Sequence, residues 1–247
     1  MAHQFLVPEL GDTAPGALVE LTGAEARHAA GATRVRVGET IRVGNGSGLI
    51  ASGEVVSVAS SVVAISVTEV ERSAEPSDLP LLVQALAKGD RDELAVQAAT
   101  ELGVSGIVPW QAARSVSRWS GPKIEKGRQR WATIAREATK QSLRAWVPPV
   151  AEPHGTADLA ALCATRTVLV LEPRAALSLG EAHRRTAGEG GAPFALVVGP
   201  EGGISPDERE LLAAAGAVEV SLGTGVLRTS TAGPAALAAI AALEGRW

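Results

Sequence analysis

Two glycine-rich segments near the C-terminus constrain the fold most strongly. The first, residues 199–204, reads Gly-Pro-Glu-Gly-Gly-Ile, and the second, residues 222–228, reads Leu-Gly-Thr-Gly-Val-Leu-Arg. Each follows a short apolar run and leads into a run with helical character. Because glycine adopts positive φ and lets the main chain approach a ligand closely, such loops suit ligand binding. The pair predicts a sheet protein that wraps two strand–loop–helix turns around a small molecule.

The composition is that of a globular protein, with 46% hydrophobic and 20% charged residues among 247. Cys163 is the only cysteine, which excludes a disulfide framework or a cysteine-rich metal site within one chain. No apolar run reaches the length of a membrane span, and the N-terminus lacks the pattern of a signal peptide. We therefore expect a cytoplasmic protein without a membrane partner and without a bound metal.

Basic residues are concentrated in one part of the chain. The net charge is −4, yet residues 111–150 hold nine lysines and arginines against two glutamates, which gives this segment a charge of +7. Four of the five tryptophans lie in or beside it. A local basic field with aromatic rings predicts binding of a polyanion such as RNA. The alternative is a solvated helix face with core tryptophans; Trp119, in a loop, is the better stacking candidate than Trp131.

Residues 1–72 are expected to form a small β-barrel. Apolar, alternating and β-branched stretches predict several short strands, interrupted by one helix near residues 23–30. Asn45-Gly46 lies between two of these stretches and is a strong hairpin signal. The polar stretch 73–78 has the character of a linker, and the pattern changes after it.

Residues 79–247 alternate between strand and helix, which predicts an α/β domain with a mostly parallel sheet covered by helices. Ser205 with Glu208, and Asp90 with Glu93, have the spacing of capping boxes at helix starts. The expected strands are 81–87, 106–109, 167–171, 194–198 and 218–222, and the expected helices are 90–102, 123–143, 206–216 and 231–243.

The first glycine segment does not match the common nucleotide-binding patterns. A P-loop ends in Gly-Lys-Ser/Thr, a dinucleotide fingerprint reads Gly-x-Gly-x-x-Gly, and neither is present. A structural turn is the alternative to a ligand site. Pro200 and Glu201 between the glycines favour the ligand site, because a carboxylate at the end of a parallel strand lies where α/β sheets bind ligands.

The second glycine segment is unusually apolar for a surface turn. Val226 and Leu227 in its middle suit a pocket that holds an apolar or aromatic ring. Arg228 at a helix N-terminus opposes the helix dipole, which favours a functional role over a solvated charge. Ser230 or Thr231 is expected to cap the final helix.

The two C-terminal segments together match a known family. Residues 198–208, Val-Gly-Pro-Glu-Gly-Gly-Ile-Ser-Pro-Asp-Glu, with residues 222–229, Leu-Gly-x-x-Val-Leu-Arg-Thr, resemble the motifs of the RsmE-type 16S ribosomal RNA uridine N3-methyltransferases of the SPOUT superfamily. Weaker similarities extend the resemblance over nearly the whole chain, at residues 46–48, 88–93, 101–104, 114–116 and 137–144.

The resemblance implies an architecture and a set of partners. It implies a PUA-like, RNA-binding β-barrel at 1–72, a linker at 73–78, and a SPOUT α/β methyltransferase domain with a C-terminal trefoil knot at 79–247. The implied cofactor is S-adenosylmethionine, bound in the knot loops. The implied assembly is a homodimer whose active site uses both chains, and the implied substrate is 16S ribosomal RNA in the small ribosomal subunit.

The resemblance also carries over individual residues. The expected cofactor contacts are Leu171, Val198, Gly199, Pro200, Glu201, Gly202, Gly203, Ile204, Leu222, Gly223, Val226, Leu227 and Thr229. The expected RNA contacts are Lys88, Arg91, Arg118, Trp119, Arg136, Lys140, Gln141 and Arg144. The expected catalytic residues are Arg228 and Arg114.

Methyl transfer to uridine N3 sets the chemical requirements. Holding methyl group and nucleophile in line can supply up to about 7–11 kcal/mol of the barrier. The N3 must also lose its proton, and a nearby cation lowers its pKa, a role expected for Arg228 or Arg114. Glu201 is expected to organise its loop, because a carboxylate beside the developing anion would repel it. No histidine stands out as a general base: His28, His154 and His183 are expected to be structural or surface residues.

The chain departs from the family pattern at three places. Thr224-Gly225 stands where the family usually has Pro-Arg, Ser230 stands where it has glutamate, and His3-Gln4 replaces an arginine. These departures bear on RNA contacts more than on the cofactor. Three alternatives stay open: a SPOUT enzyme acting on a 2′-hydroxyl or another base, a non-catalytic RNA-binding factor, and a Rossmann-type nucleotide enzyme, which the absent fingerprint disfavours.

Overall fold

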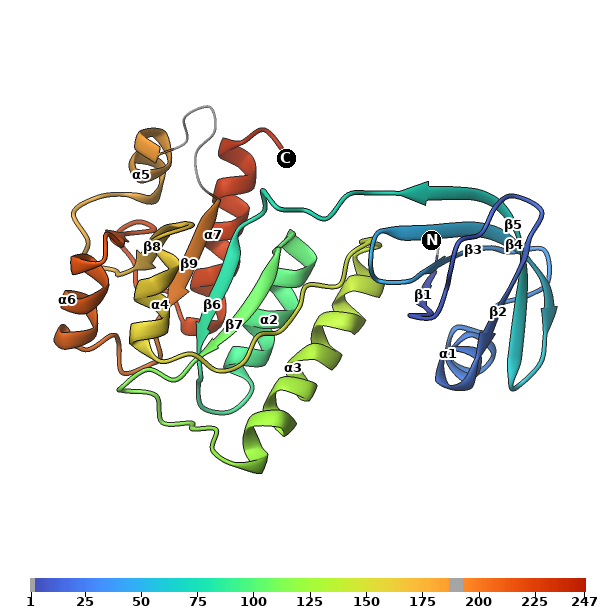
Figure 1. Ribbon diagram of the computed structural model, residues 1–247, viewed down its shortest axis with the longest axis horizontal. Coiled ribbons are helices and arrows are strands. Elements are labelled where there is room, and N and C mark those ends of the chain that lie inside the picture. Colours follow the sequence, from blue (N-terminus) through green and yellow to red (C-terminus); the bar gives the residue numbers. More distant parts are fainter. Residues whose placement is uncertain (1–2, 187–192) are drawn as a thin grey trace. The chain divides into compact units, whose positions relative to one another are not determined.

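The structure, a computed structural model, describes residues 3–186 and 193–247. The chain forms two compact units, which are described separately. The first comprises Met1–Pro76 together with Arg136–Val147, and the second comprises Ser77–Ala135 with Pro148–Trp247 (Figure 1). Residues 136–147 fold with the N-terminal unit.

A curled sheet forms the body of the first unit. Among the described residues it has five strands in the order β1-β3-β4-β5-β2, and β1 and β2 are its unpaired edges, so it is a half-barrel rather than a closed barrel. Its buried face is rich in Val and Ile, which suit a pleated surface. The elements are β1 (Gln4–Leu6), β2 (Leu18–Thr22), α1 (Gly23–Arg27) with a π-helical turn (His28–Thr33), β3 (Thr40–Gly44), β4 (Leu49–Val58) and β5 (Val62–Arg72).

The predicted hairpin is present between β3 and β4. The Asn45 side-chain oxygen accepts hydrogen bonds from the backbone N–H groups of Ser47 (2.7 Å) and Leu49 (3.1 Å), which closes the turn. Gly48 has φ +96°, and a Cβ there would lie 2.8 Å from the Trp146 ring. Only glycine therefore fits at this position.

Residues 136–147 join the first unit through polar contacts. Lys140 Nζ lies 3.2 Å from Glu25 and 2.9 Å from Glu137. Arg136 donates to the Leu6 carbonyl oxygen. The Gln4 side-chain amide donates to the Arg144 carbonyl oxygen at 2.7 Å. Charges that the sequence places in a basic segment thus serve the packing of this unit.

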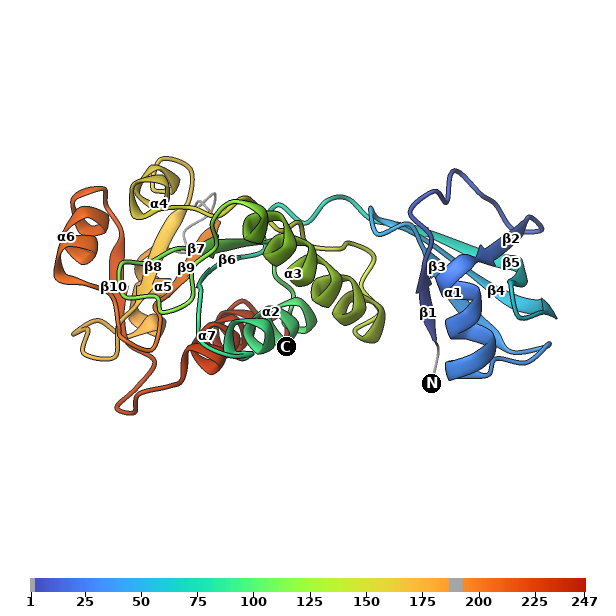
Figure 2. The ribbon, with the colours of Figure 1, turned by 90° about the horizontal axis from the view of Figure 1, so that it is seen from below.

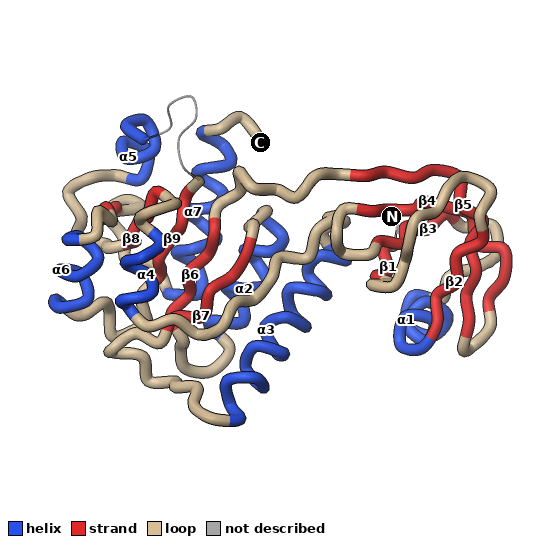
Figure 3. Tube along the Cα trace, viewed as in Figure 1, coloured by secondary structure: helices blue, strands red, loops and turns tan. Residues whose placement is uncertain are grey.

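A parallel sheet forms the centre of the second unit. All its strand pairs are parallel, and the order is β10-β8-β9-β6-β7 among the described residues (Figures 2 and 3). The elements are β6 (Leu81–Ala85), α2 (Arg91–Leu102), β7 (Gly106–Trp110), α3 (Pro122–Gln141), α4 (Thr156–Leu162), β8 (Thr167–Leu171), α5 (Leu179–Thr186), β9 (Phe194–Val198), α6 (Pro206–Ala214), β10 (Val218–Val220) and α7 (Thr229–Leu243).

Both faces of this sheet are buried, because successive strand residues point to opposite sides. Leu82 and Leu196 contribute to a core with α2, α3, α5 and α7. Their neighbours Val83 and Val197 contribute to a second core with α4 and α6. The continuous apolar runs in the sequence therefore correspond to strands covered on both faces, which confirms the predicted α/β class. The predicted trefoil knot stays a prediction.

Helix starts match the sequence signals in part. Ser205 and Glu208 form the predicted capping box at α6. The box predicted at Asp90 is wrong: its side chain makes no capping bond. The Asp92 carboxylate instead accepts from the N–H groups of Ala87 (3.1 Å) and Glu93 (2.9 Å).

The start of the last helix also differs from the expectation. The helix α7 begins at Thr229, with Arg228 in the capping position, so Ser230 and Thr231 do not cap it. Two further helices, α4 and α5, were not predicted because each spans only about two turns. For α5 a signal was present, since Ser178 and Glu181 form a capping box. None of the helices in the described part of the chain is long and apolar enough to cross a membrane.

Candidate cofactor pocket

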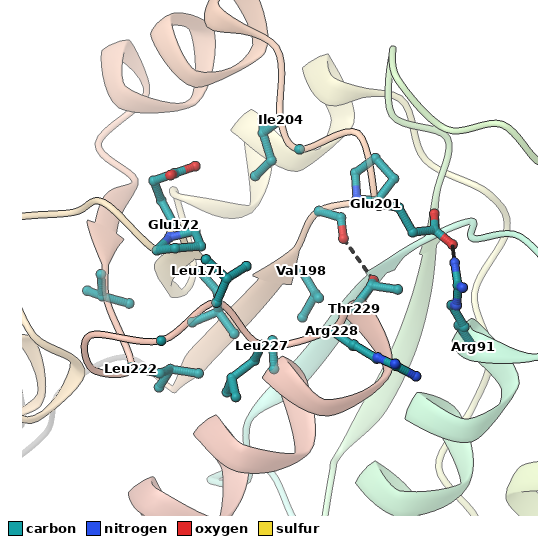
Figure 4. A pocket seen from close by; sticks show the side chains of 18 residues that line it. Arg91, Leu171, Glu172, Val198, Glu201, Ile204, Leu222, Leu227, Arg228 and Thr229 are labelled. Atoms are coloured by element: carbon teal, nitrogen blue, oxygen red, sulfur yellow. Dashed lines mark hydrogen bonds and ion pairs between the residues drawn. The ribbon is translucent and has the colours of Figure 1, made fainter.

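A pocket of about 410 Å3 opens at the C-terminal ends of β8, β9 and β10, with the two glycine segments in its walls (Figure 4). Its size is that of small-molecule sites, and its place is where parallel sheets bind ligands. It is lined by Arg91, Leu171, Glu172, Pro173, Val198, Gly199, Pro200, Glu201, Gly203, Ile204, Val220, Leu222, Gly225, Val226, Leu227, Arg228, Thr229 and Ala232.

The first glycine loop, residues 199–204, is a tight turn that folds back on itself. The Gly203 N–H donates to the Pro200 carbonyl at 2.9 Å, and Gly203 has φ +70°. A Cβ on Gly199 would lie 2.7 Å from the Ile204 side chain. The glycines thus allow Ile204 to pack against the base of the loop, where it forms part of the pocket wall.

Glu201 anchors the tip of the first glycine loop to the start of α2. Its carboxylate accepts from Arg91 Nη1 at 2.6 Å and from the Lys88 N–H at 3.1 Å. Burial disfavours the charged form, but these hydrogen bonds outweigh it and hold the pKa of Glu201 below its usual value. The carboxylate is engaged in holding the loop, as the sequence predicted.

The second glycine loop, residues 222–228, supplies apolar side chains. Val226 is 80% exposed and Leu227 39% exposed, and both side chains line the pocket. The Thr229 hydroxyl donates to the Gly199 carbonyl at 2.8 Å and accepts from the Gln84 amide at 2.9 Å. This buried hydroxyl ties the second loop to the first loop and to β6.

The lining chemistry fits an adenosyl sulfonium compound. Leu171, Val198 and Leu227 offer apolar walls to a flat ring, and the glycines leave main-chain N–H and C=O groups approachable. The Glu172 carboxylate lines the same cavity and favours a nearby positive charge, whereas the Glu201 carboxylate is paired with Arg91. The residues therefore fit S-adenosylmethionine, the cofactor that the resemblance implies.

Comparisons with known proteins agree with this geometry. The chain matches an RNA methyltransferase domain over residues 75–241. It is 41% identical to the ribosomal RNA small subunit methyltransferase E of Mycobacterium tuberculosis, over 100% of this chain and 94% of the relative. It is 35% identical to the protein of the same name from Bacillus subtilis, over 89% of this chain and 88% of the relative. The chain belongs to the ribosomal RNA small subunit methyltransferase E family.

A solved member of the methyltransferase E family shows the same fold. The crystal structure of the Neisseria gonorrhoeae protein bound to S-adenosyl methionine superposes with a TM-score of 0.86 at 29% identity, and the match covers 98% of both chains. The predicted family and fold class are confirmed, and the fit of the pocket to S-adenosylmethionine agrees with the ligand of that relative.

The residues that the methyltransferase E resemblance assigned to the cofactor are brought together. All of them except Gly202 and Gly223 line the pocket. The sequence missed Glu172, Pro173, Val220, Gly225 and Ala232. Glu172 and Pro173 directly follow β8, so their position after a parallel strand was an available signal.

Of the two predicted catalytic arginines, Arg228 lines the pocket and Arg114 does not. Arg228 is exposed, and its side chain has no hydrogen-bond or ionic partner within residues 3–186 and 193–247. In Figure 4 its side chain extends from the start of α7 away from Leu171 and Leu222. Arg114 does not line the pocket; its Nη1 donates to the Gly202 carbonyl at 3.2 Å, on the first glycine loop.

Several predicted RNA contacts are engaged inside the protein. Arg136 and Lys140 pair with Glu25, and Lys140 is only 8% exposed. Burial lowers the pKa of Arg144. Arg91 is held by Glu201. These four side chains therefore have partners within the protein or are partly buried, and their contact with RNA stays a prediction.

Trp119 is partly buried in the second unit. Its ring meets Trp131 edge-to-face, with centroids 5.2 Å apart, and covers Gly127 so closely that no Cβ fits there. It packs against the core of the second unit, and its stacking on RNA stays a prediction. The predicted RNA contacts that remain exposed are Lys88, Arg118 and Gln141.

Proposed function

We propose that this protein transfers the methyl group of S-adenosylmethionine to N3 of a uridine in the 16S RNA of the small ribosomal subunit. The observation that carries the proposal is the pocket built by both glycine loops at the carboxyl edge of the parallel sheet. Relatives named as small-subunit methyltransferases, one of them bound to S-adenosyl methionine, support it. Such a substrate is expected in the cytoplasm.

The pocket residues have distinct tasks in binding the cofactor. Leu171, Val198 and Leu227 would enclose the adenine ring, and the main chain of the first glycine loop would approach the polar part. The bound cofactor supplies an electrophilic methyl group for in-line displacement. Glu201, held by Arg91, keeps the loop shaped before the cofactor arrives, which reduces the entropic cost of binding.

Arg228 is the residue that best meets the charge requirement of the reaction. The uridine N3 proton must leave before or during attack, and the resulting negative charge spreads over the ring. A cation at the rim of a low-dielectric pocket stabilises that charge and lowers the N3 pKa. Arg228 lies at such a rim and is not neutralised by a carboxylate in the described residues.

The RNA-binding surface of the second unit is narrower than the basic segment suggests. Arg128 and Arg130 are paired with glutamates. Four cations in the loop after β7 and the first turns of α3 are exposed and have no ionic partner among the described residues: Arg114, Arg118, Lys123 and Lys126. We propose that this group, called here the α3 basic cluster, meets the phosphate backbone.

The last helix supports a homodimer. Helix α7 carries almost only apolar and small residues, and a helix that is apolar all round is normally buried. Its outer side nevertheless shows Pro234, Ala235, Ala238 and Leu243, the last 46% exposed. A second copy of the chain would cover this side through a symmetric contact.

The decisive experiment identifies the modified nucleoside. Small ribosomal subunits from a strain lacking the modification are incubated with the protein and labelled S-adenosylmethionine, and the RNA is digested for mass spectrometry. We expect label in 3-methyluridine at one position. Label in a 2′-O-methyl nucleoside would assign another SPOUT activity. Absence of S-adenosylmethionine binding by calorimetry would leave a non-catalytic RNA-binding factor.

A further inference from the structure

Glu208 receives more hydrogen bonds than a helix cap requires. It lies in the first turn of α6 and is 7% exposed. Its Oε2 accepts from the Ser205 N–H (3.1 Å) and the Ser205 hydroxyl (2.8 Å), which completes the capping box. Its Oε1 accepts from the Ala113 N–H at 2.8 Å and from the Thr156 hydroxyl at 2.9 Å. The second pair has no part in capping α6.

The donors to Oε1 come from two other segments of the second unit. Ala113 lies in the loop after β7, and Thr156 is the first residue of α4. The buried Trp110 indole N–H in turn donates to the Thr156 hydroxyl at 3.3 Å. One carboxylate therefore joins the loop after β7, the start of α4 and the end of the first glycine loop.

The anchored loop carries one of the candidate catalytic arginines. Arg114 directly follows Ala113, and its guanidinium reaches back to the Gly202 carbonyl at 3.2 Å. The Ala113 carbonyl also accepts from Arg118 at 3.0 Å. Ala113, the residue before Arg114, is thus held through its own N–H by Glu208, while the Arg114 side chain lies on the glycine loop that lines the pocket.

The anchor is charged although no cation neutralises it within residues 3–186 and 193–247. Burial disfavours the ionised form, but the bonds from Ala113, Ser205 and Thr156 outweigh it, so the pKa of Glu208 lies below its usual value. Hydrogen bonds to an ionised acceptor are stronger than neutral ones and hold their partners in tighter geometry.

We propose that Glu208 is a positioning residue for methyl transfer: it fixes the loop that carries Arg114 against the first glycine loop, so that Arg114 is aimed at the substrate beside the pocket. This inference rests on the proposed function, because the benefit of the alignment is expressed in the reaction with RNA. Misplacing a catalytic group by about 1 Å can cost about 100-fold in rate.

The first test is a double-mutant cycle between Glu208→Gln and Arg114→Ala. The glutamine offers a single acceptor oxygen, so at least one pair of donors loses its partner. We expect kcat with small subunits to fall about 10- to 100-fold, with the S-adenosylmethionine Kd changed less than about threefold. In the Arg114→Ala background the same change should cost less than about threefold. Independent, multiplying losses would overturn the proposal.

Matched variants separate alignment from stability. Ser205→Ala removes the hydroxyl that donates to Oε2 and accepts from the Glu208 N–H, and it leaves both donors to Oε1 in place, so we expect a lower Tm with kcat retained. Thr156→Val removes a donor to Oε1 and the acceptor of the Trp110 N–H without touching the cap, and we expect kcat to fall several-fold, with a loss of Tm of the same order as in Ser205→Ala. If Ser205→Ala lowered kcat as much as Thr156→Val, Glu208 would be a structural residue only. Thr156→Val also keeps the test decisive if Glu208→Gln does not fold.

A readout without activity distinguishes failure of this inference from failure of the proposed function. Amide hydrogen exchange of residues 111–116 reports how firmly the loop is held. We expect faster exchange there in Thr156→Val and Glu208→Gln than in the wild-type protein. If the wild-type protein transferred no methyl group to subunits, the proposed function would fail and exchange would still decide whether Glu208 anchors the loop. Unchanged exchange in both variants would overturn the anchoring.

Discussion

Single residues at this site have roles that follow from the partners they have or lack. Glu201 and Glu208 are carboxylates with several donors each, and both organise loops. Arg228 is a cation with no partner among the described residues, at a helix N-terminus that disfavours it electrostatically. The two hydrogen-bonded carboxylates stabilise the protein, whereas the unpaired charge of Arg228 at the pocket rim is available to a substrate.

Arg228→Ala is expected to lower kcat about 100- to 1,000-fold, the range seen when one stabilising donor is removed from a transition state. The S-adenosylmethionine Kd should stay within a few-fold, because the apolar walls and the main chain are unchanged. Initial rates with small subunits and calorimetry with the cofactor measure the two quantities. Arg184→Ala, an exposed arginine on α5, is the control. Wild-type turnover in Arg228→Ala would remove this residue from the mechanism.

The lowered pKa of Glu208 should make the stability of the folded protein depend on pH. Its pKa in the folded state is depressed below the ordinary value of 4.5, so it stabilises the fold above that pH, and this stability is lost as the pH falls through the folded pKa. Glu208→Gln should cost about 2 kcal/mol of unfolding free energy at pH 7. Urea unfolding of both proteins should show the difference shrinking below pH 4.5. A constant difference down to pH 3 would contradict the ionised anchor.

On helix α3, ion pairs with distant glutamates neutralise several of the cations that make its sequence basic. Its segment looks basic, but Glu93, Glu152 and Glu25 reach it from elsewhere in the chain. Only its first turns and the loop before them keep free cations in the described residues. These three glutamates lie between 24 and 115 residues from their partners on α3, so a local sequence pattern does not predict the ion pairs.

Two basic residues of α3, Lys126 and Arg130, should therefore differ in their effect on RNA binding. With about four phosphate contacts from the α3 basic cluster, log affinity should fall with log salt at a slope of roughly −2.8 to −3.6. Lys126→Ala should reduce that slope by about one. Arg130→Ala, whose side chain is paired with Glu93, serves as the matched control and should leave the slope unchanged. Filter binding from 50 to 300 mM salt, roughly the range in which such slopes are measured, decides between them. Equal slopes in all three proteins would exclude this cluster.

At the scale of the whole molecule, the apolar outer side of α7 is the surface on which we expect a second copy of the chain to dock. A second copy would bury it, and the proposed active site would then draw on both chains. Ala238→Glu, which places a charge in the middle of that side, should give a monomer by sedimentation velocity and lose methyl transfer. Ala213→Glu on the exposed side of α6 is the control and should change neither. A wild-type monomer, or a dimeric Ala238→Glu protein, would refute the homodimer.

Local patterns in the chain were enough to predict the alternation of strands and helices, the hairpin at Asn45, the box at Ser205 and the two loops that line the pocket. These depend on backbone conformation and periodicity over a few residues, which neighbouring residues specify. The free or paired state of each arginine, the packing of Trp119 and the three-way anchor at Glu208 depend on which distant segments meet. Those contacts form only when segments far apart in the sequence pack around a shared core, so they arise only in the folded chain.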